Sequence, residues 1–146
     1  MVVCEHTVPF CILNSRGMMI VGLGLDLVDV RKLASSLKRE SFRRKVFTPA
    51  EIAACSRLKN SSECYAGKFA AKEAFMKAIG SGLCQGTWFS QIQVLGKATG
   101  EPSITLTGEA RRIFQSLGSI SVRVSISHSS GFAVAVVVLE KMDKHK

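Results

Sequence analysis

The sequence predicts an α+β fold in which an antiparallel sheet packs around a long central helix. Residues 120–128 alternate apolar and polar side chains without a break, which is typical of a half-buried strand. Residues 132–139 are apolar throughout and follow a Ser-Ser-Gly turn, so the two segments form a hairpin. A long helical segment begins at Ser62 and ends at the Gly-Ser-Gly of residues 80–82.

The first strand of the predicted sheet covers residues 19–28. It is mostly apolar but contains Gly22 and Gly24, and glycines inside a strand indicate that another part of the molecule approaches closely. Asp29 follows this strand and can cap a helix that extends to about residue 40.

The middle of the chain supplies shorter elements. Thr48 has the position of an N-cap, a proline follows it, and Glu51 completes a capping box, so a helix is expected to about residue 58. Residues 92–95 and 103–106 are expected to form two strands joined by a turn. A further helix should begin at Thr107 and end near residue 117.

The chain of 146 residues fits one domain, with 47% hydrophobic and 21% charged residues as in ordinary globular proteins. We assign residues 1–18 to an N-terminal extension of unknown role and residues 19–146 to a single domain. No segment contains the roughly 18 apolar residues needed to span a bilayer, so no membrane association is expected. The five cysteines are odd in number and include no CxxC pair, so we interpret them as reduced thiols in a cytoplasmic protein.

The formal net charge of +9 concerns the partners of the protein and not its fold. It suits an acidic protein, a phosphate-rich small molecule or a nucleic acid. A basic RNA-binding protein is one alternative, but the chain has one Trp, one Tyr and no recognised RNA-binding motif. No nucleic-acid partner is therefore expected.

Two carboxylates and a lysine stand in apolar surroundings. Asp26 is the only carboxylate within the first strand, where an unpaired charge is costly, so it is either paired with a lysine or bound to a metal. Glu73 and Lys77 share one helix face through their i,i+4 spacing. That pair is either a salt bridge at a rim or a metal ligand beside a phosphate-binding ammonium. Because no His or Cys cluster accompanies them, Asp26 and Glu73 would suit Mg²⁺.

His128 lies on the apolar parity of its strand and therefore points to the inner face. It is either a hydrogen-bonded core histidine or a donor to a phosphate of a ligand. The neighbouring serines point the opposite way, so a Ser–His dyad is not expected.

Three separated blocks, residues 22–31 (GLGLDLVDVR), 68–82 (KFAAKEAFMKAIGSG) and 126–129 (ISHS), together resemble the holo-[acyl-carrier-protein] synthases of the 4′-phosphopantetheinyl transferase superfamily. Residues 47–51 (FTPAE) and 100–102 (GEP) also look like this family. The resemblance covers about residues 19–140. It implies a 4′-phosphopantetheinyl transferase-like fold.

The resemblance also implies the reaction. The 4′-phosphopantetheine group of coenzyme A passes to a serine of apo acyl carrier protein, 3′,5′-ADP is released, and the carrier is activated for fatty acid biosynthesis. Asp26, Glu73 and Lys77 are the implied catalytic residues, and Asp26 and Glu73 hold Mg²⁺. The base for the serine proton is either Glu73 or a metal-bound water. The implied coenzyme A contacts are Lys59, Lys68, Lys77, Gly80, Gly82, Pro102, His128 and Ser129.

The family implies a homotrimer with active sites between subunits. An acidic carrier protein would dock on a basic face formed by Arg31, Lys32, Lys38, Arg39, Arg43 and Arg44. The chain departs from the family in having Lys68 where an Arg is frequent and Ser81 in place of a common Thr. A related protein that binds coenzyme A or a carrier without catalysis is a second alternative, which the intact Asp26, Glu73 and Lys77 disfavour.

Overall fold

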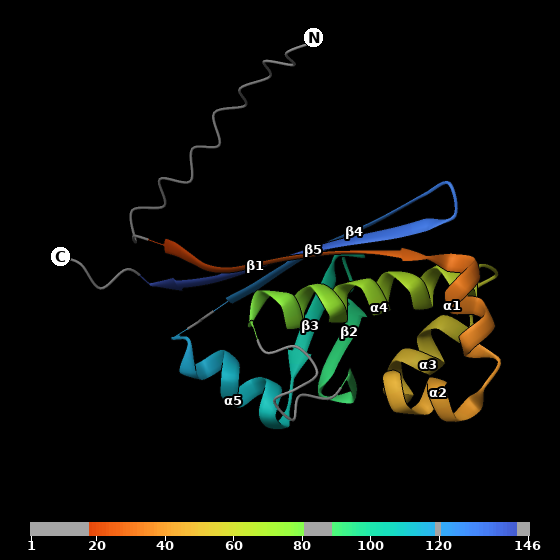
Figure 1. Ribbon diagram of the computed structural model, residues 1–146, viewed down its shortest axis with the longest axis horizontal. Helices are drawn as coiled ribbons and strands as arrows, with labels where there is room; N and C mark the ends of the chain where they lie inside the picture. Colours follow the sequence, from red (N-terminus) through yellow and green to blue (C-terminus); the bar gives the residue numbers. More distant parts are fainter. Residues whose placement is uncertain (1–17, 81–88, 119–120, 143–146) are drawn as a thin grey trace, which may run out of the picture.

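The computed structural model describes residues 18–80, 89–118 and 121–142. It confirms the α+β class (Figure 1). The elements in chain order are β1 (Met18–Asp29), α1 (Val30–Leu37), α2 (Glu40–Val46), α3 (Pro49–Ser56), α4 (Ser61–Ala78), the 3₁₀ helix η2 (Phe89–Gln91), β2 (Ile92–Gly96), β3 (Pro102–Leu106), α5 (Gly108–Ser116), β4 (Ser121–Ser129) and β5 (Phe132–Met142).

Three strands form the main sheet, in the antiparallel order β1-β5-β4. Strand β5 lies in the centre, paired with β1 on one edge and with β4 on the other. Its inward side chains, from Ala133 to Leu139 in alternation, are buried against helix α4. The β2–β3 hairpin forms a separate two-stranded sheet.

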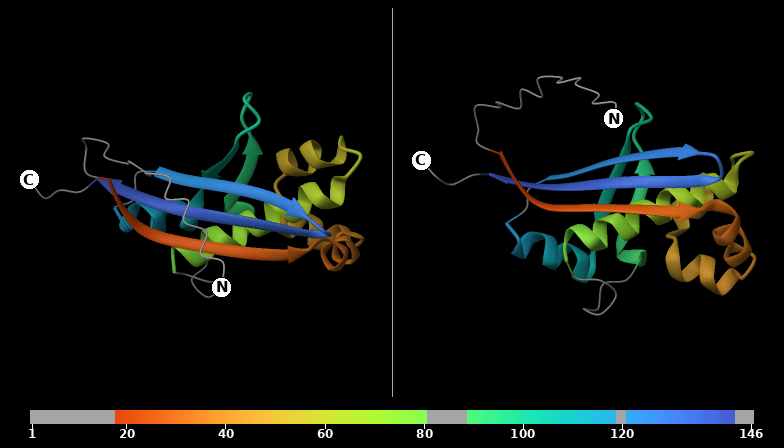
Figure 2. Two further views of the ribbon diagram at one scale, coloured as in Figure 1. Left: turned by 90° about the horizontal axis from the view of Figure 1, so that it is seen from above. Right: turned by 45° about the horizontal axis from the view of Figure 1, so that its top comes forward.

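Helix α4 lies directly on the inner face of strand β1. A Cβ atom added to Gly24 would overlap the carbonyl oxygen of Ala74, and one added to Gly22 would overlap that of Ala78. The two glycines therefore let the helix backbone touch the strand, as the sequence indicated. On the outer face, no element among the described residues covers the sheet (Figure 2).

The helix expected from Asp29 to about residue 40 is present but ends at Leu37, and a second helix that was not expected follows it. Asp29 caps α1 by accepting hydrogen bonds from the backbone N–H groups of Arg31 and Lys32, as predicted. However, α1 ends at Leu37, and Arg39 adopts an extended conformation before α2 begins. The break turns α2 toward α4, so that Val46 and Phe47 enter the core. No helix in the described part of the chain is long and apolar enough to cross a bilayer.

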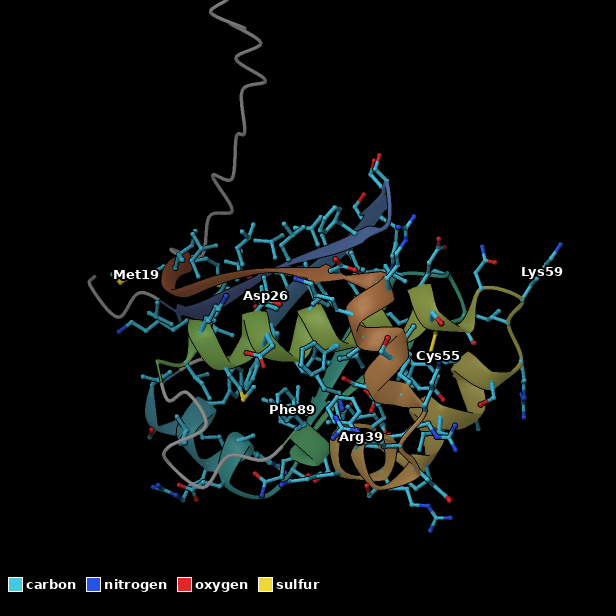
Figure 3. All side chains as sticks on the ribbon, turned by 45° about the vertical axis from the view of Figure 1, so that its right-hand side comes forward. Met19, Asp26, Arg39, Cys55, Lys59 and Phe89 are labelled. Atoms are coloured by element: carbon cyan, nitrogen blue, oxygen red, sulfur yellow. A yellow bond between two sulfur atoms is a disulfide. The ribbon has the colours of Figure 1, made fainter. Side chains whose placement is uncertain are left out.

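The interpretation of all five cysteines as thiols is wrong for two of them. Cys55 at the end of α3 and Cys64 in the first turn of α4 form a disulfide, with their Cα atoms 5.5 Å apart (Figure 3). No CxxC pattern announces this bond, because it joins two helices across an intervening loop. The other three cysteines lie outside the described residues.

Candidate active site

Asp26 reaches the site because it occupies an inward position of β1, two residues after Gly24. Figure 3 labels Asp26 on this strand. Its Oδ1 accepts a hydrogen bond from Lys77 Nζ at 2.7 Å, and its side chain is 16% exposed. Lys77 Nζ also donates to the carbonyl oxygen of Leu25 at 3.0 Å. Lys77 on α4 is therefore paired with Asp26 on β1 and not with Glu73 on its own helix.

Glu73 lies one turn before Lys77 on α4 and faces the same strand. Burial raises the pKa of its carboxyl group, the charge of Asp26 raises it further, and the Lys77 ammonium partly offsets both effects. The structure thus holds two carboxylates close enough to repel each other, with the Lys77 ammonium paired to one of them, Asp26. A cation at this point would relieve the repulsion.

The donor set fits a hard divalent cation. Among the described residues no group of three or more His, Cys, Asp and Glu side chains forms a metal cage. Two carboxylates without a third protein ligand suit Mg²⁺, which keeps several waters and takes substrate phosphates as further ligands. Asp26 and Glu73 are the residues that could hold it.

A pocket of about 450 Å³ opens in front of these carboxylates. Strand β1 forms one side, α1 and α2 form the second, and α4 forms the third. Its lining combines charged and apolar side chains: Asp26, Leu27, Val28, Asp29, Lys32, Leu33, Ser36, Phe42, Phe69 and Glu73. We call it the carboxylate pocket.

A second pocket, of about 290 Å³, lies near the other end of α4, between the β2–β3 hairpin and β4. Lys68, Pro102 and His128 line it, and we call it the hairpin pocket. Lys68 Nζ donates to the carbonyl oxygen of Val94 at 2.5 Å, and burial lowers the pKa of this lysine against the opposing effect of Glu51.

His128 closes the wall of the hairpin pocket. Its Nε2 lies 2.9 Å from the carbonyl oxygen of Glu63, and its ring packs against Gly67, where a Cβ would come within 2.9 Å of Nε2. The inner-face orientation predicted from strand parity is therefore present.

The two pockets share no lining residue among those described. Strand β5 separates β1, which carries Asp26, from β4, which carries His128. Along α4, Gly67 and Lys77 are ten residues apart, which is about 15 Å of helix. The two pockets therefore lie on different sides of the same helix.

Comparison with known proteins identifies the family. A family model of the 4′-phosphopantetheinyl transferase superfamily matches residues 22–137. The chain belongs to this superfamily. It is 40% identical over 124 residues to a holo-[acyl-carrier-protein] synthase from Koribacter versatilis, covering 84% of this chain and 99% of that protein.

Solved structures of such synthases share the fold of this chain. The holo-[acyl-carrier-protein] synthase from Neisseria meningitidis superposes with a TM-score of 0.76 at 31% identity. The match covers 84% of this chain and 100% of that one. The enzyme from Bacillus anthracis, in complex with CoA (3′,5′-ADP), has a TM-score of 0.70 at 36% identity, covering 84% and 98% of the two chains. The resemblance seen in the sequence is thus confirmed.

Several residues implied for coenzyme A binding in this transferase lie outside both pockets. Lys59 is exposed and points away from the body of the molecule (Figure 3). Gly80 follows the C-terminal end of α4, far from His128, and has a positive φ of 69°. The hydroxyl group of Ser129 contacts that of Ser130 at 3.4 Å. Gly82 lies outside the described residues.

The sequence did not reveal that two aromatic side chains line the carboxylate pocket, or that a buried lysine lies beside it. Phe42 and Phe69 line the carboxylate pocket, and Lys72 is fully buried next to Glu73. Phe69 stands four residues before Glu73 on the same helix face, which is a usable signal. Phe42 carries no such signal, because the separate helix α2 that presents it was not expected.

Proposed function

We propose that this protein transfers the 4′-phosphopantetheine group of coenzyme A to a serine of apo acyl carrier protein and releases 3′,5′-ADP. The observation that carries the proposal is that Asp26 and Glu73 line one pocket, with Lys77 bonded to Asp26, in a member of this superfamily. The products of this reaction would be activated carriers for fatty acid biosynthesis.

Asp26 and Glu73 would hold Mg²⁺ together with the pyrophosphate of coenzyme A. The bound metal would neutralise charge that develops on the phosphate oxygens during transfer. Lys77, which is 53% exposed, keeps donor capacity beyond its bonds to Asp26 and Leu25 and can bind a phosphate oxygen. Glu73 is the nearby carboxylate that can accept the proton of the serine hydroxyl.

The reaction exchanges one phosphorus–oxygen bond for another. The serine oxygen of the carrier attacks the β-phosphorus of coenzyme A, and the bond from that phosphorus to the oxygen bridging to the α-phosphate breaks. The serine proton passes to Glu73, and 3′,5′-ADP leaves with the bridging oxygen. Positioning and charge neutralisation supply most of the acceleration in phosphoryl transfer of this kind.

The hairpin pocket would bind the nucleotide end of coenzyme A. His128 supports this assignment because its ring lines the pocket, where it can meet the 3′-phosphate. Lys68 adds a buried positive charge, and Pro102 an apolar wall for the adenine. The complex of the Bacillus anthracis relative with CoA (3′,5′-ADP) is consistent with a nucleotide site in this fold.

A homotrimer would join the two pockets. Three leucines on the outer face of β1 are exposed: Leu23 by 65%, Leu25 by 59% and Leu27 by 61%. They pair across the sheet with three valines of β5, at positions 138, 136 and 134. An apolar face of this kind is typical of a subunit interface. With neighbouring subunits packed there, the carboxylate pocket of one could meet the hairpin pocket of the next.

The acidic carrier would dock beside the carboxylate pocket. Helices α1 and α2 present basic side chains, all exposed except the half-buried Arg43, and Lys32 both belongs to this face and lines the pocket. The complete basic set is Arg31, Lys32, Lys38, Arg39, Arg43 and Arg44. Because such contacts are largely electrostatic, KM for the carrier should rise with ionic strength.

Intact-mass analysis tests the reaction. Purified apo acyl carrier protein is incubated with this protein, coenzyme A and Mg²⁺, with an EDTA control. We expect a metal-dependent gain of one phosphopantetheine group that Glu73→Gln abolishes. Binding of coenzyme A and Mg²⁺ without any mass gain, across several carriers, would instead establish a binding protein without transferase activity.

Complementation tests the shared site. Glu73→Gln removes the metal half and His128→Ala the nucleotide half, so each variant alone should have little activity. When the two are co-expressed, some interfaces combine an intact carboxylate pocket with an intact hairpin pocket, and activity should return. If mixed oligomers form but stay inactive, both halves belong to one subunit and the shared-site proposal is wrong.

A further inference from the structure

Lys72 stands between Lys68 and Lys77 on α4, yet it has no donor left for a substrate. Its side chain is 0% exposed. Its Nζ donates to the carbonyl oxygen of Val46 at 2.7 Å, to Glu51 Oε2 at 2.7 Å and to the carbonyl oxygen of Phe89 at 3.0 Å. An ammonium has three protons, so all of them are used inside the protein.

Glu51 is equally satisfied. Besides Lys72, its Oε2 accepts from the backbone N–H of Thr48 at 2.7 Å, and its Oε1 accepts from that of Val94 at 2.7 Å. One buried ion pair therefore ties α4 to the end of α2, to the start of α3, to η2 and to β2. These connections are directional, because each bond fixes a donor and an acceptor in place.

Two of the connections lead to the carboxylate pocket. Phe89, whose carbonyl Lys72 holds, stacks its ring on that of Phe69 at a centroid distance of 5.3 Å. Phe69 in turn lines the pocket. Val46, whose carbonyl Lys72 also holds, ends α2, the helix that places Phe42 in the same wall.

The third connection is through the helix itself. Glu73 follows Lys72 directly, so their side chains leave α4 about 100° apart. With Lys72 fixed on one side, the rotation of α4 about its axis is fixed, and Glu73 is aimed at β1 and Asp26. We propose that Lys72, with Glu51, is a positioning residue of the divalent-cation site. This inference rests on the proposed function of Asp26 and Glu73 as metal ligands.

The test uses the double variant Glu51→Gln/Lys72→Met, which removes both charges, keeps similar volumes and leaves neither partner buried alone. Mn²⁺ serves as the probe, with its binding measured by electron paramagnetic resonance on the full chain. We expect the folded variant to bind Mn²⁺ about tenfold more weakly, in the range found when groups behind metal ligands are removed. Added Mg²⁺ should partly restore transfer. The matched control Glu109→Gln/Arg112→Met removes an exposed pair on α5 and should change neither property.

The outcomes separate the possibilities. If the variant has a lower melting temperature but its folded form binds Mn²⁺ as the wild type does, Lys72 is merely structural and the proposal is overturned. If the wild type itself binds no more Mn²⁺ than Asp26→Asn, the metal assignment of the carboxylate pocket is what fails, and the positioning inference fails with it.

The disulfide carries a second, independent inference. Cys64 lines the hairpin pocket, whereas Cys55 is 0% exposed. The bond fixes the first turn of α4 to the last turn of α3, next to Glu63, whose carbonyl oxygen lies 2.9 Å from His128 Nε2. We propose that this bond is a redox-sensitive brace of the hairpin pocket, an inference that rests on the proposed nucleotide binding there.

The geometry defines the reduction step. A dithiol reductant would enter through the pocket, and its thiolate would attack Cys64 Sγ, the accessible sulfur. The Sγ–Sγ bond breaks, and Cys55 leaves as a thiolate that takes up a proton. The second thiol of the reductant then attacks the mixed disulfide, frees Cys64 as a thiol and leaves the reductant oxidised. Nucleotide bound in the pocket should therefore slow this attack. Separately, loss of the bond frees the turn that carries Glu63, the partner of His128, so reduction should weaken nucleotide binding.

The probe for this test is 3′,5′-ADP, which has no thiol of its own. The oxidised full chain is treated with dithiothreitol, and alkylation of Cys55 and Cys64 is followed by peptide mass analysis. We expect saturating 3′,5′-ADP to slow reduction at least about threefold, and reduction to raise its Kd by a similar factor. The Cys55→Ser/Cys64→Ser variant should show no response of its Kd to dithiothreitol.

Three results would overturn this second proposal in distinguishable ways. Alkylation of both cysteines in air-exposed protein without reductant would show that the bond does not persist. Equal Kd values for 3′,5′-ADP in the oxidised and reduced protein would show that the disulfide does not affect nucleotide binding. Absence of 3′,5′-ADP binding in either state would overturn the assignment of the hairpin pocket itself.

Discussion

Two carboxylate–lysine pairs on the same helix have the same length and opposite surroundings. Lys77 contacts Asp26 at 2.7 Å, and Lys72 contacts Glu51 at 2.7 Å. The first pair has side chains 53% and 16% exposed, and the second has both at 0%. Distance alone therefore says nothing about which pair belongs to a reacting site.

The hydrogen-bond inventory explains the difference. Lys72 spends its three protons on protein acceptors, whereas Lys77 has two acceptors and an open side toward solvent. Asp26 has a second carboxylate, Glu73, near it, while Glu51 accepts hydrogen bonds from Lys72 and from the backbone N–H groups of Thr48 and Val94. The site around Asp26 and Lys77 has unused hydrogen-bonding capacity and two carboxylates that repel each other, so it can bind a ligand. The Lys72–Glu51 pair has no capacity left and stabilises the fold.

Breaking the buried pair should produce the largest effect on folding. Glu51→Gln leaves the Lys72 ammonium buried without its counter-charge and should lower the free energy of unfolding by about 3–5 kcal/mol. Urea unfolding followed by circular dichroism measures this change. A loss below about 1 kcal/mol, the value expected of an exposed pair, would show that the pair is not isolated from water.

Breaking the exposed pair should affect catalysis and leave folding almost unchanged. Asp26→Asn keeps the side-chain volume but removes one metal ligand and the partner of Lys77. We expect kcat/KM to fall at least about a hundredfold, as when one preorganised electrostatic group is removed, with a stability change within about 1 kcal/mol. Steady-state transfer assays and urea unfolding of the same preparation test both parts. An active Asp26→Asn variant would refute the assigned chemistry.

The sequence distinguished these pairs only in part. Asp26 stood out because an aspartate inside an apolar strand needs a partner, and Glu73 and Lys77 stood out on an apolar helix face. Glu51 was recognised as a capping-box residue, which it is, since the side chains and backbones of Thr48 and Glu51 bond reciprocally. Its bond to Lys72 joins residues 21 positions apart. Such a contact depends on how α3 packs against α4, which no local pattern encodes.

The same limit explains the other misses. Strands β1, β4 and β5 were predictable because their alternation or continuous apolarity follows from burial of one face or both. The break between α1 and α2 was not, because Arg39 caps α2 without a side-chain hydrogen bond. The Cys55–Cys64 bond likewise depends on the packing of two helices. Local sequence patterns therefore predicted most helices and strands and the candidate metal ligands Asp26 and Glu73. Contacts between elements far apart in the sequence could be seen only in the structure.

Close contact between β1 and α4 is what lets the exposed pair form, so widening it should move Asp26 away from Glu73. Gly24→Ala places a Cβ against the carbonyl oxygen of Ala74 and should cost about 1–3 kcal/mol of stability. Transfer activity should fall as well, because the strand that carries Asp26 must shift. Gly96→Ala is the matched control for stability alone, since its nearest heavy atom is 4.0 Å from the added Cβ but Gly96 lines the hairpin pocket. Equal tolerance of both substitutions would mean that β1 can move without consequence.

The smallest expected effect is on the stability of the metal-free protein, and its sign is diagnostic. Glu73 is needed for activity, yet its carboxylate should destabilise the fold when no metal is bound. Burial and the Asp26 charge raise the pKa of Glu73 above its ordinary value of 4.5, which the unfolded chain retains. Between these two pKa values the folded chain binds more protons than the unfolded chain, so stability falls as pH rises through that window. Above it, the ionised carboxylate keeps its full destabilising effect.

Glu73→Gln should therefore raise the melting temperature of the metal-free protein near pH 7.5, by no more than about 4 °C, while abolishing transfer. At a pH below 4.5 the two proteins should melt together, because both side chains are then neutral. Adding Mg²⁺ at pH 7.5 should raise the melting temperature of the wild type and not that of the variant, since the cation needs the carboxylate. Melting curves at both pH values, with EDTA or Mg²⁺, decide the matter. A variant that melts lower than the wild type in EDTA at pH 7.5 would show that the Glu73 carboxylate stabilises the fold, and the contrast between the site around Asp26 and Lys77 and the Lys72–Glu51 pair would be lost.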